Sequence, residues 1–341
     1  MLKRKTFIHH GGALGDLLLS LPCVRAIKAD SGYIHLAGRP DVVGLLRDAS
    51  VVDEASSTDS CLYASLYTER AEEKTAEFLA QFERAFVFTT RGESLLAANI
   101  GMIVPRTETI ITVPCGETRT HVAHFRLKQL GVHREQDYLV TKLDIPSAYT
   151  EKAKNSLVKA GYADDRRPLI ALHPGSGSGR KCWPLENYFA LIERMMENLD
   201  PFCILFSGLA ESPAIREKIK EFARRHKRIL PVCDEQLSTV AALLSLCDLY
   251  VGNDSGISHL AAAVNGNVIA LYGPTDPLLW RPVGQKVRSI SAGAPPSSLL
   301  SITVNEVYET LRLTSPISGI YQESGREDHK KLRSVNFVSN P

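Results

Sequence analysis

The sequence predicts an α/β protein with two domains, each built around a parallel sheet. Its 341 residues exceed what one hydrophobic core usually supports, so two cores are expected. Short apolar segments alternate with amphipathic ones, which is typical of parallel βαβ units. This alternation stops in a polar stretch at residues 146–168 and then begins again. We therefore place the interdomain linker in that stretch, with a helix of its own at residues 150–161.

The first half contains three strand candidates and one clear helix. Strands are expected at residues 6–9, 33–36 and 85–88, where apolar residues cluster. An amphipathic helix is expected at residues 16–29, between the first two of these strands. Together these segments predict an N-terminal Rossmann-like domain over residues 1–150.

The strand pattern is clearer in the second half. Five apolar segments are predicted as strands, at residues 169–172, 202–206, 229–232, 248–251 and 268–272. Amphipathic helices fit between them. We expect a C-terminal Rossmann-like domain over residues 165–300 and a C-terminal helix within residues 301–313. The tail at residues 314–341 is rich in Ser, Gly and charge and is expected to be disordered.

The charge balance argues against nucleic acid as a partner. Lys and Arg number 40, Asp and Glu number 38, and no dense basic block stands out. The formal net charge of +2 leaves room for weak attraction to an anionic membrane surface. No apolar run approaches the roughly 18 to 20 residues that a membrane-spanning helix needs. We therefore expect no membrane span, and peripheral membrane contact at most.

The opening residues and the cysteines point to the cytoplasm. Residues 1–10 place three basic residues before a short apolar run that His9 and His10 end, so a secretory signal is not predicted. The seven cysteines are odd in number and never spaced as Cys-x-x-Cys, which argues against a disulfide framework and a zinc site. A reducing, cytoplasmic location is therefore expected.

The first motif with chemical meaning is the glycine-rich turn at residues 11–16, GGALGD, directly after the first strand. Such a turn lets the backbone approach a ligand and offers free N–H groups. Asp16 then stands at a helix N-terminus on the carboxyl edge of the sheet, where open α/β sheets bind ligands. By itself, an Asp there is more often a helix cap than a base. The glycines do not match the G-x-G-x-x-G fingerprint, so a dinucleotide cofactor is not predicted.

The second motif is the loop at residues 173–184, HPGSGSGRKCWP, which also joins a strand to a helix. Its glycines and Ser176 offer backbone amides that suit a phosphate, and Lys181 adds a positive charge. The spacing G-x-x-x-x-G-K-[ST] is not met, because Cys182 follows Lys181, so a Walker ATPase is rejected. The alternative interpretation is a solvent-exposed glycine-serine connector.

The third motif is the segment at residues 251–264, VGNDSGISHLAAAV. Asp254 ends a strand, and Ser255 and Gly256 open a helix whose unpaired amides and positive dipole end suit an anion. His259 follows one turn later, near that anion. Taken alone, His259 is more often a structural histidine, and Asp254 or Ser255 simply a helix cap.

The three motifs together support a functional prediction that none of them supports alone. Two lie in the second half, at strand ends, and have a phosphate-binding character. One lies in the first half and carries a carboxylate. This layout predicts a phosphorylated donor held by one domain and an acceptor activated by the other.

These motifs resemble those of glycosyltransferase family 9, the ADP-heptose:lipopolysaccharide heptosyltransferases. The resemblance extends from about Ile8 to about Leu313, and its specific parts are residues 15–28, 173–184, 252–264 and 270–277. It implies the GT-B architecture, in which two Rossmann-like domains with parallel sheets face each other across a cleft. It also implies that the N-terminal domain binds the acceptor and the C-terminal domain binds the nucleotide sugar.

The resemblance also implies roles for individual residues. Asp16 is the general base, and Lys181 contacts the donor phosphates. Asp254 and His259 line the sugar and diphosphate site, and Glu211 binds the donor ribose. With the two loops described above, the expected donor site consists of Ser176, Lys181, Glu211, Asp254, Ser255, Gly256 and His259.

The acceptor side is less clearly defined, because the segments that face it resemble the family only loosely. Their side chains Arg91, Arg119, His121 and Arg126 suit acidic sugars or phosphates, although arginines on a helix face are usually just solvated. We take Arg91, Arg119 and His121 as candidate acceptor-binding residues.

The expected reaction is an inverting sugar transfer in one displacement. The resemblance favours heptose from ADP-heptose as the donor and a lipid-linked lipopolysaccharide inner-core acceptor. The sequence shows no carboxylate or His/Cys cluster with ligand spacing, so no metal and no cofactor are predicted. The expected location is the cytoplasm, at the inner face of the inner membrane where a lipid-linked acceptor is met.

Two alternatives stay open. A nucleotide-sugar epimerase of the same architecture would need acid and base groups around the donor ring and no second substrate, so incubation with the donor alone would reveal it. A catalytically inactive nucleotide-sugar-binding protein would bind the donor without turnover. The presence of both Asp16 and Lys181 speaks against this second alternative.

Overall fold

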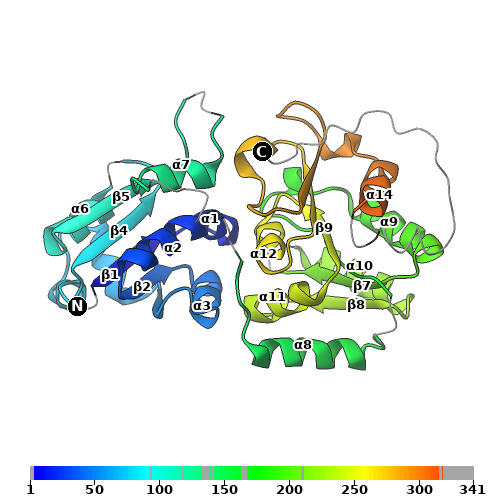
Figure 1. The fold of residues 1–341 in the computed structure, drawn as a ribbon, viewed down its shortest axis with the longest axis horizontal. Coiled ribbons are helices and arrows are strands. Elements are labelled where there is room, and N and C mark those ends of the chain that lie inside the picture. Colours follow the sequence, from blue (N-terminus) through cyan, green and yellow to red (C-terminus); the bar gives the residue numbers. More distant parts are fainter. Residues whose placement is uncertain are drawn as a thin grey trace. The chain divides into compact units, whose positions relative to one another are not determined.

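The computed structural model describes residues 4–92, 94–116, 119–132, 139, 142–162, 167–208, 211–314 and 317. The chain divides into two compact units, Met1–Pro146 and Ser147–Pro341, and each has its own parallel sheet with flanking helices (Figure 1). The predicted α/β fold class is therefore confirmed. No helix within the described ranges is long and apolar enough to cross a membrane.

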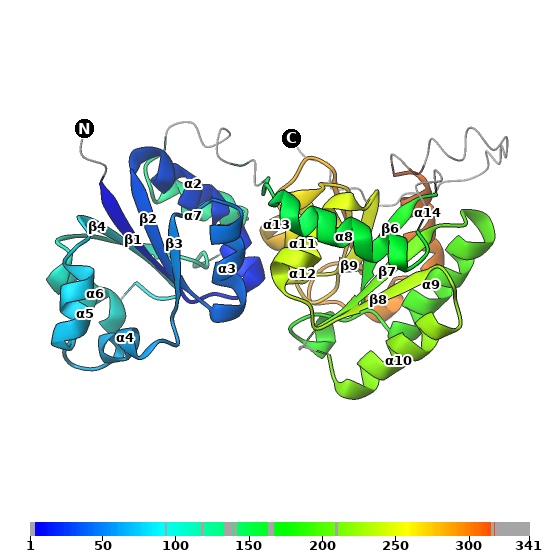
Figure 2. The same ribbon diagram turned by 90° about the horizontal axis from the view of Figure 1, so that it is seen from below.

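The first unit is a five-stranded parallel sheet in the order β3-β2-β1-β4-β5. Its strands are β1 (Lys5–His10), β2 (Tyr33–Gly38), β3 (Glu54–Ser57), β4 (Arg84–Thr89) and β5 (Arg106–Ile111). Its helices are α1 (Leu14–Leu19), α2 (Leu21–Asp30), α3 (Pro40–Asp48), α4 (Cys61–Ala64), the single 3-10 turn η1 (Ser65–Tyr67), α5 (Glu73–Leu79), α6 (Leu95–Ile103) and α7 (Val122–Lys128). Helices α4, α5 and α6 lie on one face of the sheet and α2, α3 and α7 on the other (Figure 2).

The helix predicted at residues 16–29 is in fact two helices, because the chain bends at Ser20. Ser20 ends α1 and precedes α2, whose second residue is Pro22. Proline has no N–H to continue the hydrogen-bond ladder of the preceding helix, but it is well tolerated in a first turn. The break leaves the Ser20 hydroxyl buried inside the unit.

Every predicted strand is present, but three further strands were missed. These are β3, β5 and, in the second unit, β11 (Val287–Ser291), which all lie at the edge of a sheet. Their sequences EASS, RTETII and VRSIS are only partly buried. An edge strand needs no continuous apolar run, so its sequence lacks the signal by which the central strands were found.

The second unit is a six-stranded parallel sheet in the order β11-β10-β9-β6-β7-β8. Its other strands are β6 (Leu169–His173), β7 (Phe202–Ser207), β8 (Ile229–Cys233), β9 (Leu249–Asn253) and β10 (Val268–Tyr272). Its helices are α8 (Ser147–Lys159), α9 (Leu185–Asn198), α10 (Pro213–Arg224), α11 (Leu237–Leu246), α12 (Gly256–Val264), α13 (Pro277–Trp280) and α14 (Val304–Arg312), with 3-10 turns η3 (Gly179–Lys181) and η4 (Leu299–Ser301). Strands β6, β7, β9 and β10 are buried along their whole length, because helices cover both faces of the sheet.

The helix that we expected in the linker belongs to the second unit. Helix α8 lies against α11 (Figure 2) and buries Ala153 and Leu157. The boundary between the units therefore falls before this helix, at Pro146 and Ser147. At the other end, Thr314 and Ile317 are buried. The rest of the tail for which disorder was predicted lies outside the described residues.

Candidate functional site

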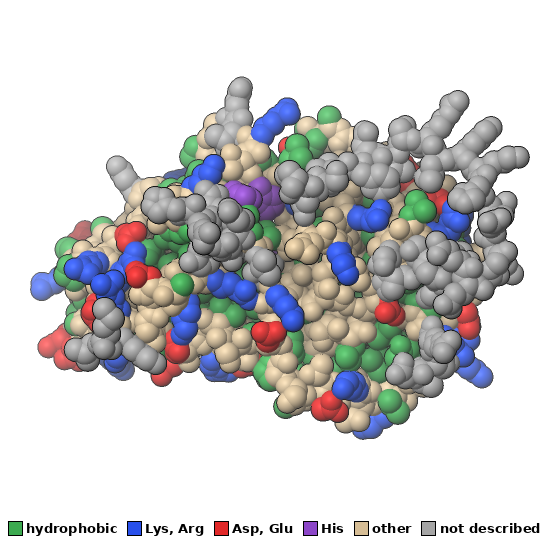
Figure 3. Space-filling model, viewed as in Figure 1, with side chains coloured by type: hydrophobic (Ala, Val, Ile, Leu, Met, Phe, Trp, Pro, Cys, Tyr) green, Lys and Arg blue, Asp and Glu red, His purple; other side chains and the backbone are tan. Residues whose placement is uncertain are grey.

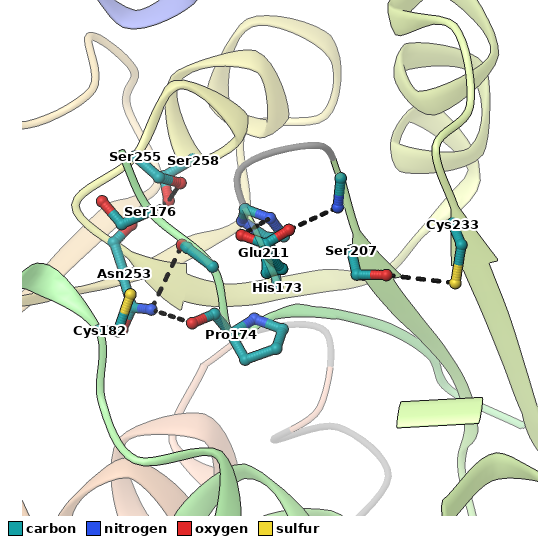
Figure 4. A network of polar contacts seen from close by, with 12 residues as sticks. His173, Pro174, Ser176, Cys182, Ser207, Glu211, Cys233, Asn253, Ser255 and Ser258 are labelled. Carbon is teal, nitrogen blue, oxygen red and sulfur yellow. Dashed lines mark hydrogen bonds and ion pairs between the residues drawn. The ribbon is translucent and has the colours of Figure 1, made fainter. Parts of the chain in front are cut away.

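Two of the predicted motifs meet at the carboxyl edge of the second sheet. Strands β6 and β9 are parallel neighbours, with His173 opposite Gly252. The loop that follows β6, residues 173–184, and the turn between β9 and α12 therefore leave the sheet side by side, and polar contacts join them (Figure 4). This edge is where open α/β sheets bind ligands.

Asn253, at the end of β9, holds the loop after β6 in place. Its Nδ2 donates to the carbonyl of Pro174 at 2.7 Å. Its Oδ1 accepts from the backbone N–H of Trp183 and from the Tyr188 hydroxyl, both at 3.0 Å. Asn253 is fully buried, so each of these bonds is shielded from water. The loop is thus fixed at both ends, although residues 177–180 between them are exposed, so the alternative interpretation of a solvent-exposed glycine-serine connector still describes its middle.

Lys181 and Asp254 form an ion pair across the same two segments. The Lys181 Nζ donates to Asp254 Oδ2 at 2.7 Å, and the Thr275 hydroxyl donates to the same oxygen at 2.6 Å. The Ser176 hydroxyl donates to the backbone carbonyl of Asp254 at 2.7 Å. The side chain of Asp254 is 8% exposed and that of Lys181 is 32% exposed. A buried carboxylate with two donors therefore holds a cation that solvent can still reach.

The start of α12 lies next to this pair and has no side-chain cap. Ser255 is the N-cap residue, but its side chain accepts no bond from the helix backbone. The Ser255 hydroxyl is instead 3.4 Å from that of Ser258, which donates to the carbonyl of Asn253. A helix start without a cap keeps its amides available to an anion. His259 lies buried in the first turn.

Glu211 lies buried on the other side of the β6 loop. One carboxylate oxygen accepts from the backbone N–H of Gly208, and the other is 4.0 Å from His173 Nε2. Burial raises the pKa of Glu211 and lowers the pKa of His173 to about 4, so His173 is neutral at pH 7. A Cβ built on Gly175 would lie 1.7 Å from Glu211 Oε1, so a larger residue here would displace the Glu211 carboxylate.

In the first unit, Asp16 lies in the first turn of α1, beyond the carboxyl end of β1. Its Oδ1 accepts from Arg126 Nη2 at 3.1 Å. The side chain of Asp16 is 42% exposed, whereas that of Arg126 is fully buried. Arg126 is therefore neither a solvated arginine nor an exposed contact for the acceptor, the two alternatives that the sequence left open. It is an internal partner of the predicted base.

A buried polar layer lies beneath Asp16. His10 Nε2 is 3.0 Å from the Ser20 hydroxyl, which also accepts from Arg126 Nη1 at 2.8 Å. Burial, and secondarily the charge of Arg126, lower the pKa of His10 to about 3, so His10 is neutral at pH 7. A Cβ on Gly12 would lie 2.8 Å from Asp16 Cβ and from His10 Cε1. Only glycine fits the turn at that point.

The remaining acceptor candidates differ in their surroundings. Arg91 and Arg119 are exposed. The His121 side chain caps α7, because its Nδ1 accepts from the backbone N–H of Ala123 at 3.2 Å. The structure thus gives His121 a local structural contact that its sequence position did not reveal. Lys and Arg side chains are scattered among acidic ones on the face drawn in Figure 3.

A family model described as glycosyltransferase family 9 (heptosyltransferase) matches residues 118–305, which is more than half of the chain. The chain belongs to this family. The resemblance predicted from the three motifs is therefore confirmed.

Several curated heptosyltransferases are similar to this family 9 protein. Lipooligosaccharide heptosyltransferase 2 of Haemophilus influenzae is 34% identical over 128 residues, which is 36% of each chain. Lipopolysaccharide heptosyltransferase 2 of Salmonella typhimurium is 29% identical over 199 residues, 53% of this chain and 57% of the relative. The matched segments thus span only about a third to three fifths of these relatives.

Solved structures show the same fold. Escherichia coli ADP-heptose lps heptosyltransferase II has a TM-score of 0.73 at 22% identity, with 94% of this chain and 100% of that chain covered. A family 9 glycosyltransferase from Veillonella parvula has a TM-score of 0.72 at 17% identity, with 94% and 97% covered. The GT-B class predicted for the fold is therefore confirmed. A UDP-GlcNAc 2-epimerase from Neisseria meningitidis has a TM-score of 0.52 at 10% identity, so fold alone does not separate a transferase from an epimerase.

Proposed function

We propose that this family 9 protein is an inverting glycosyltransferase that moves heptose from ADP-heptose onto a lipid-linked lipopolysaccharide inner-core acceptor. The observation that carries the proposal is the pairing of Lys181 with the uncapped start of α12, through Asp254. A partly exposed cation beside free helix amides suits a diphosphate. The similar curated proteins named as heptosyltransferases support the choice of sugar.

On the donor side, the diphosphate is proposed to lie against the β6 loop and the start of α12. The ammonium group of Lys181 has three donors, so it can bond to a phosphate oxygen and keep its bond to Asp254. Ser176, Ser255, Gly256 and His259 belong to the same proposed site. Glu211, buried behind Gly175, is proposed to accept the donor ribose hydroxyls.

On the acceptor side, Asp16 is proposed as the general base. It removes the proton of the acceptor hydroxyl while that oxygen attacks the anomeric carbon from the face opposite the diphosphate, which inverts the configuration. The bond to the diphosphate breaks in the same step, and Lys181 and the α12 amides stabilise the negative charge that leaves. Arg91 and Arg119, both exposed, are proposed to meet anionic groups of the acceptor.

The division of labour between the domains is part of the same proposal. Residues 1–150 would bind the acceptor and residues 165–300 the nucleotide sugar, with no metal and no cofactor. An acceptor that is lipid-linked would bring the protein to the inner face of the inner membrane from the cytoplasm. Within the described ranges, no group of three or more His, Cys, Asp or Glu side chains is arranged to hold a metal ion, and metal independence stays a prediction.

The test is a transfer assay with purified protein, ADP-heptose and a lipid A–Kdo acceptor, followed by mass spectrometry of the acceptor. The expected product is heavier by one heptose and has the inverted anomeric configuration by NMR. UDP- and GDP-linked sugars serve as competing donors. A new nucleotide sugar formed from the donor alone would establish the epimerase instead, and donor binding without any product would establish the inactive binding protein.

A further inference from the structure

The side chain of Arg126 is fully buried and has a bond for every nitrogen of its guanidinium group. Nε donates to the Thr112 carbonyl at 2.9 Å. Nη1 donates to the Asp16 carbonyl at 2.6 Å and to the Ser20 hydroxyl at 2.8 Å. Nη2 donates to Asp16 Oδ1 at 3.1 Å. Two of these four bonds go to Asp16, once to its backbone and once to its carboxylate.

Arg126 is a charged residue on the buried face of α7. Helix α7 buries Val122, Ala123, Arg126 and Leu127, so the arginine lies in an otherwise apolar face. A buried charge costs several kcal/mol unless it is paired. Burial lowers the pKa of Arg126, and the Asp16 carboxylate raises it again. Among the described residues, the titratable groups that face Arg126 are Asp16, His10 and Cys23, and of these only Asp16 is a carboxylate.

We propose that Arg126 is a positioning residue for the general base Asp16, an inference that rests on the proposed function. By holding the backbone carbonyl and Oδ1 of Asp16 at once, the planar guanidinium fixes both the first turn of α1 and the rotation of the carboxylate. Arg126 leaves the other carboxylate oxygen, Oδ2, to the acceptor hydroxyl. The bond to Ser20 ties this arrangement to the bend between α1 and α2.

The first test is Arg126→Lys, which keeps the positive charge but cannot reproduce the planar guanidinium group with donors on three nitrogens. We expect kcat to fall by about 10- to 100-fold, as is typical of a reacting group held out of place. The donor KM and the affinity for ADP should change less than about twofold, because the proposed donor contacts lie in the other unit. Arg84→Lys is the matched control, since Arg84 also pairs with carboxylates of the first unit, Asp30 and Glu108. It should keep wild-type kcat.

The double variant with Asp16→Asn separates positioning from a merely structural role. If Arg126 acts through Asp16, then Arg126→Lys adds little loss once the carboxylate is gone, and the two effects are strongly non-additive. Full additivity, or a wild-type kcat in Arg126→Lys, would overturn the proposal. Should Arg126→Lys fail to fold, Ser20→Ala removes one acceptor of the guanidinium, and the same cycle with Asp16→Asn applies with an expected loss of about 3- to 10-fold.

A measurement without turnover distinguishes this proposal from the proposed function. In protein labelled with ¹⁵N-arginine, the Nη protons of Arg126 should exchange slowly with water, and Asp16→Asn should speed that exchange while Asp41→Asn should not. Unchanged exchange in Asp16→Asn overturns the positioning role. Wild-type protein that transfers no sugar from any nucleotide donor, yet shows this exchange pattern, overturns the proposed function alone.

Discussion

The two loops of the second unit and the glycine turn of the first unit hold their polar side chains in different ways. In the second unit, the key residues bind one another across adjacent strands, as Asn253 does with Trp183 and Lys181 with Asp254. In the first unit, the base candidate Asp16 is held from beneath by Arg126, which lies 110 residues away in the sequence.

This difference distinguishes a cluster of side chains that bind one another from a single carboxylate held by one buried arginine. The second unit presents a cation and a free helix start that are already fixed before any ligand arrives, which lowers the entropic cost of binding. The first unit presents a half-exposed carboxylate on a rigid support, with exposed arginines elsewhere. Under the proposed function, the second unit is therefore expected to govern donor affinity, and the first unit to govern the chemical step.

The largest effect on turnover is expected from substitution of the proposed general base, Asp16. Asp16→Asn is expected to lower kcat by about two to four orders of magnitude, since removal of a general base typically costs that much. Donor affinity should hardly change, because the proposed donor contacts lie in the second unit. The measurement is steady-state transfer plus calorimetric titration with ADP. Asp41→Asn, another acid in a helix first turn of the same unit, is the control. A variant that is folded and nearly as active as wild type would remove Asp16 from the mechanism.

The next effect should come from Lys181. Lys181→Ala should weaken ADP binding by roughly 10- to 150-fold, since a charge-assisted contact is worth about 1.5 to 3 kcal/mol. The loss of the cation also leaves the buried Asp254 carboxylate facing the phosphates, which acts in the same direction. Calorimetry with adenosine, ADP and UDP should show no change for adenosine. Lys154→Ala, an ion-paired lysine on α8, is the control. An equal loss for nucleoside and diphosphate would place Lys181 outside the phosphate site.

Asn253→Ala tests whether the contacts that hold the proposed donor site are already formed in the ligand-free protein. The change removes four buried side-chain hydrogen bonds and leaves the Tyr188 hydroxyl without this partner. We expect the free energy of unfolding to fall by about 1 to 3 kcal/mol, together with weaker ADP binding. Urea unfolding followed by circular dichroism measures the first effect. Asn198→Ala is the control. It should change neither the free energy of unfolding nor ADP binding, because the Asn198 side-chain amide donates to the Arg194 carbonyl at the exposed end of α9.

Sequence reasoning worked best where the signal was local. The central strands were found because both of their faces are buried, and the loops after β6 and β9 were found by their glycines and by their position at strand ends. Strands β3, β5 and β11 were missed because these edge strands carry polar residues, whereas the edge strand β8, with the sequence ILPVC, was found. The bend at Ser20 was missed although Pro22 marks it.

The supporting residues of the site were missed for a different reason. The contacts of Asn253 and Thr275 can be recognised only once β6, β9 and β10 are known to be neighbours in the sheet. Arg126 was named, but as a surface cation, because its contact with Asp16 depends on how α7 packs on α2. One signal was available in the sequence. Arg126 falls between apolar residues on the face of α7 that also carries Val122, Ala123 and Leu127, where a charge needs a partner.

A smaller effect should distinguish the two neighbouring acceptor candidates. Arg119→Ala should raise the acceptor KM by about 2- to 5-fold, because exposed ion pairs are worth roughly 1 kcal/mol or less and are screened by salt. His121→Ala should leave the acceptor KM unchanged and lower the free energy of unfolding by about 1 kcal/mol, as the loss of a helix cap does. Acceptor titrations at low and high salt, with urea unfolding, measure both. An acceptor KM that responds to His121→Ala and not to Arg119→Ala would reverse the assignment.

The smallest expected effect is that of a chelator. Transfer should continue in excess EDTA at a rate within about twofold of the untreated enzyme, because the proposed site already supplies positive charge from Lys181 and from the start of α12. Asp254 Oδ2, the carboxylate oxygen nearest to that charge, already accepts from Lys181 and from Thr275. A divalent ion that bound this oxygen as well as the diphosphate would compete with Lys181 for it. Lys181→Ala would then bind ADP more tightly with magnesium present than without it. Loss of transfer in EDTA that magnesium or manganese restores would instead mean that a metal ion bridges the diphosphate, and that Lys181 and the start of α12 do not suffice to stabilise the leaving group.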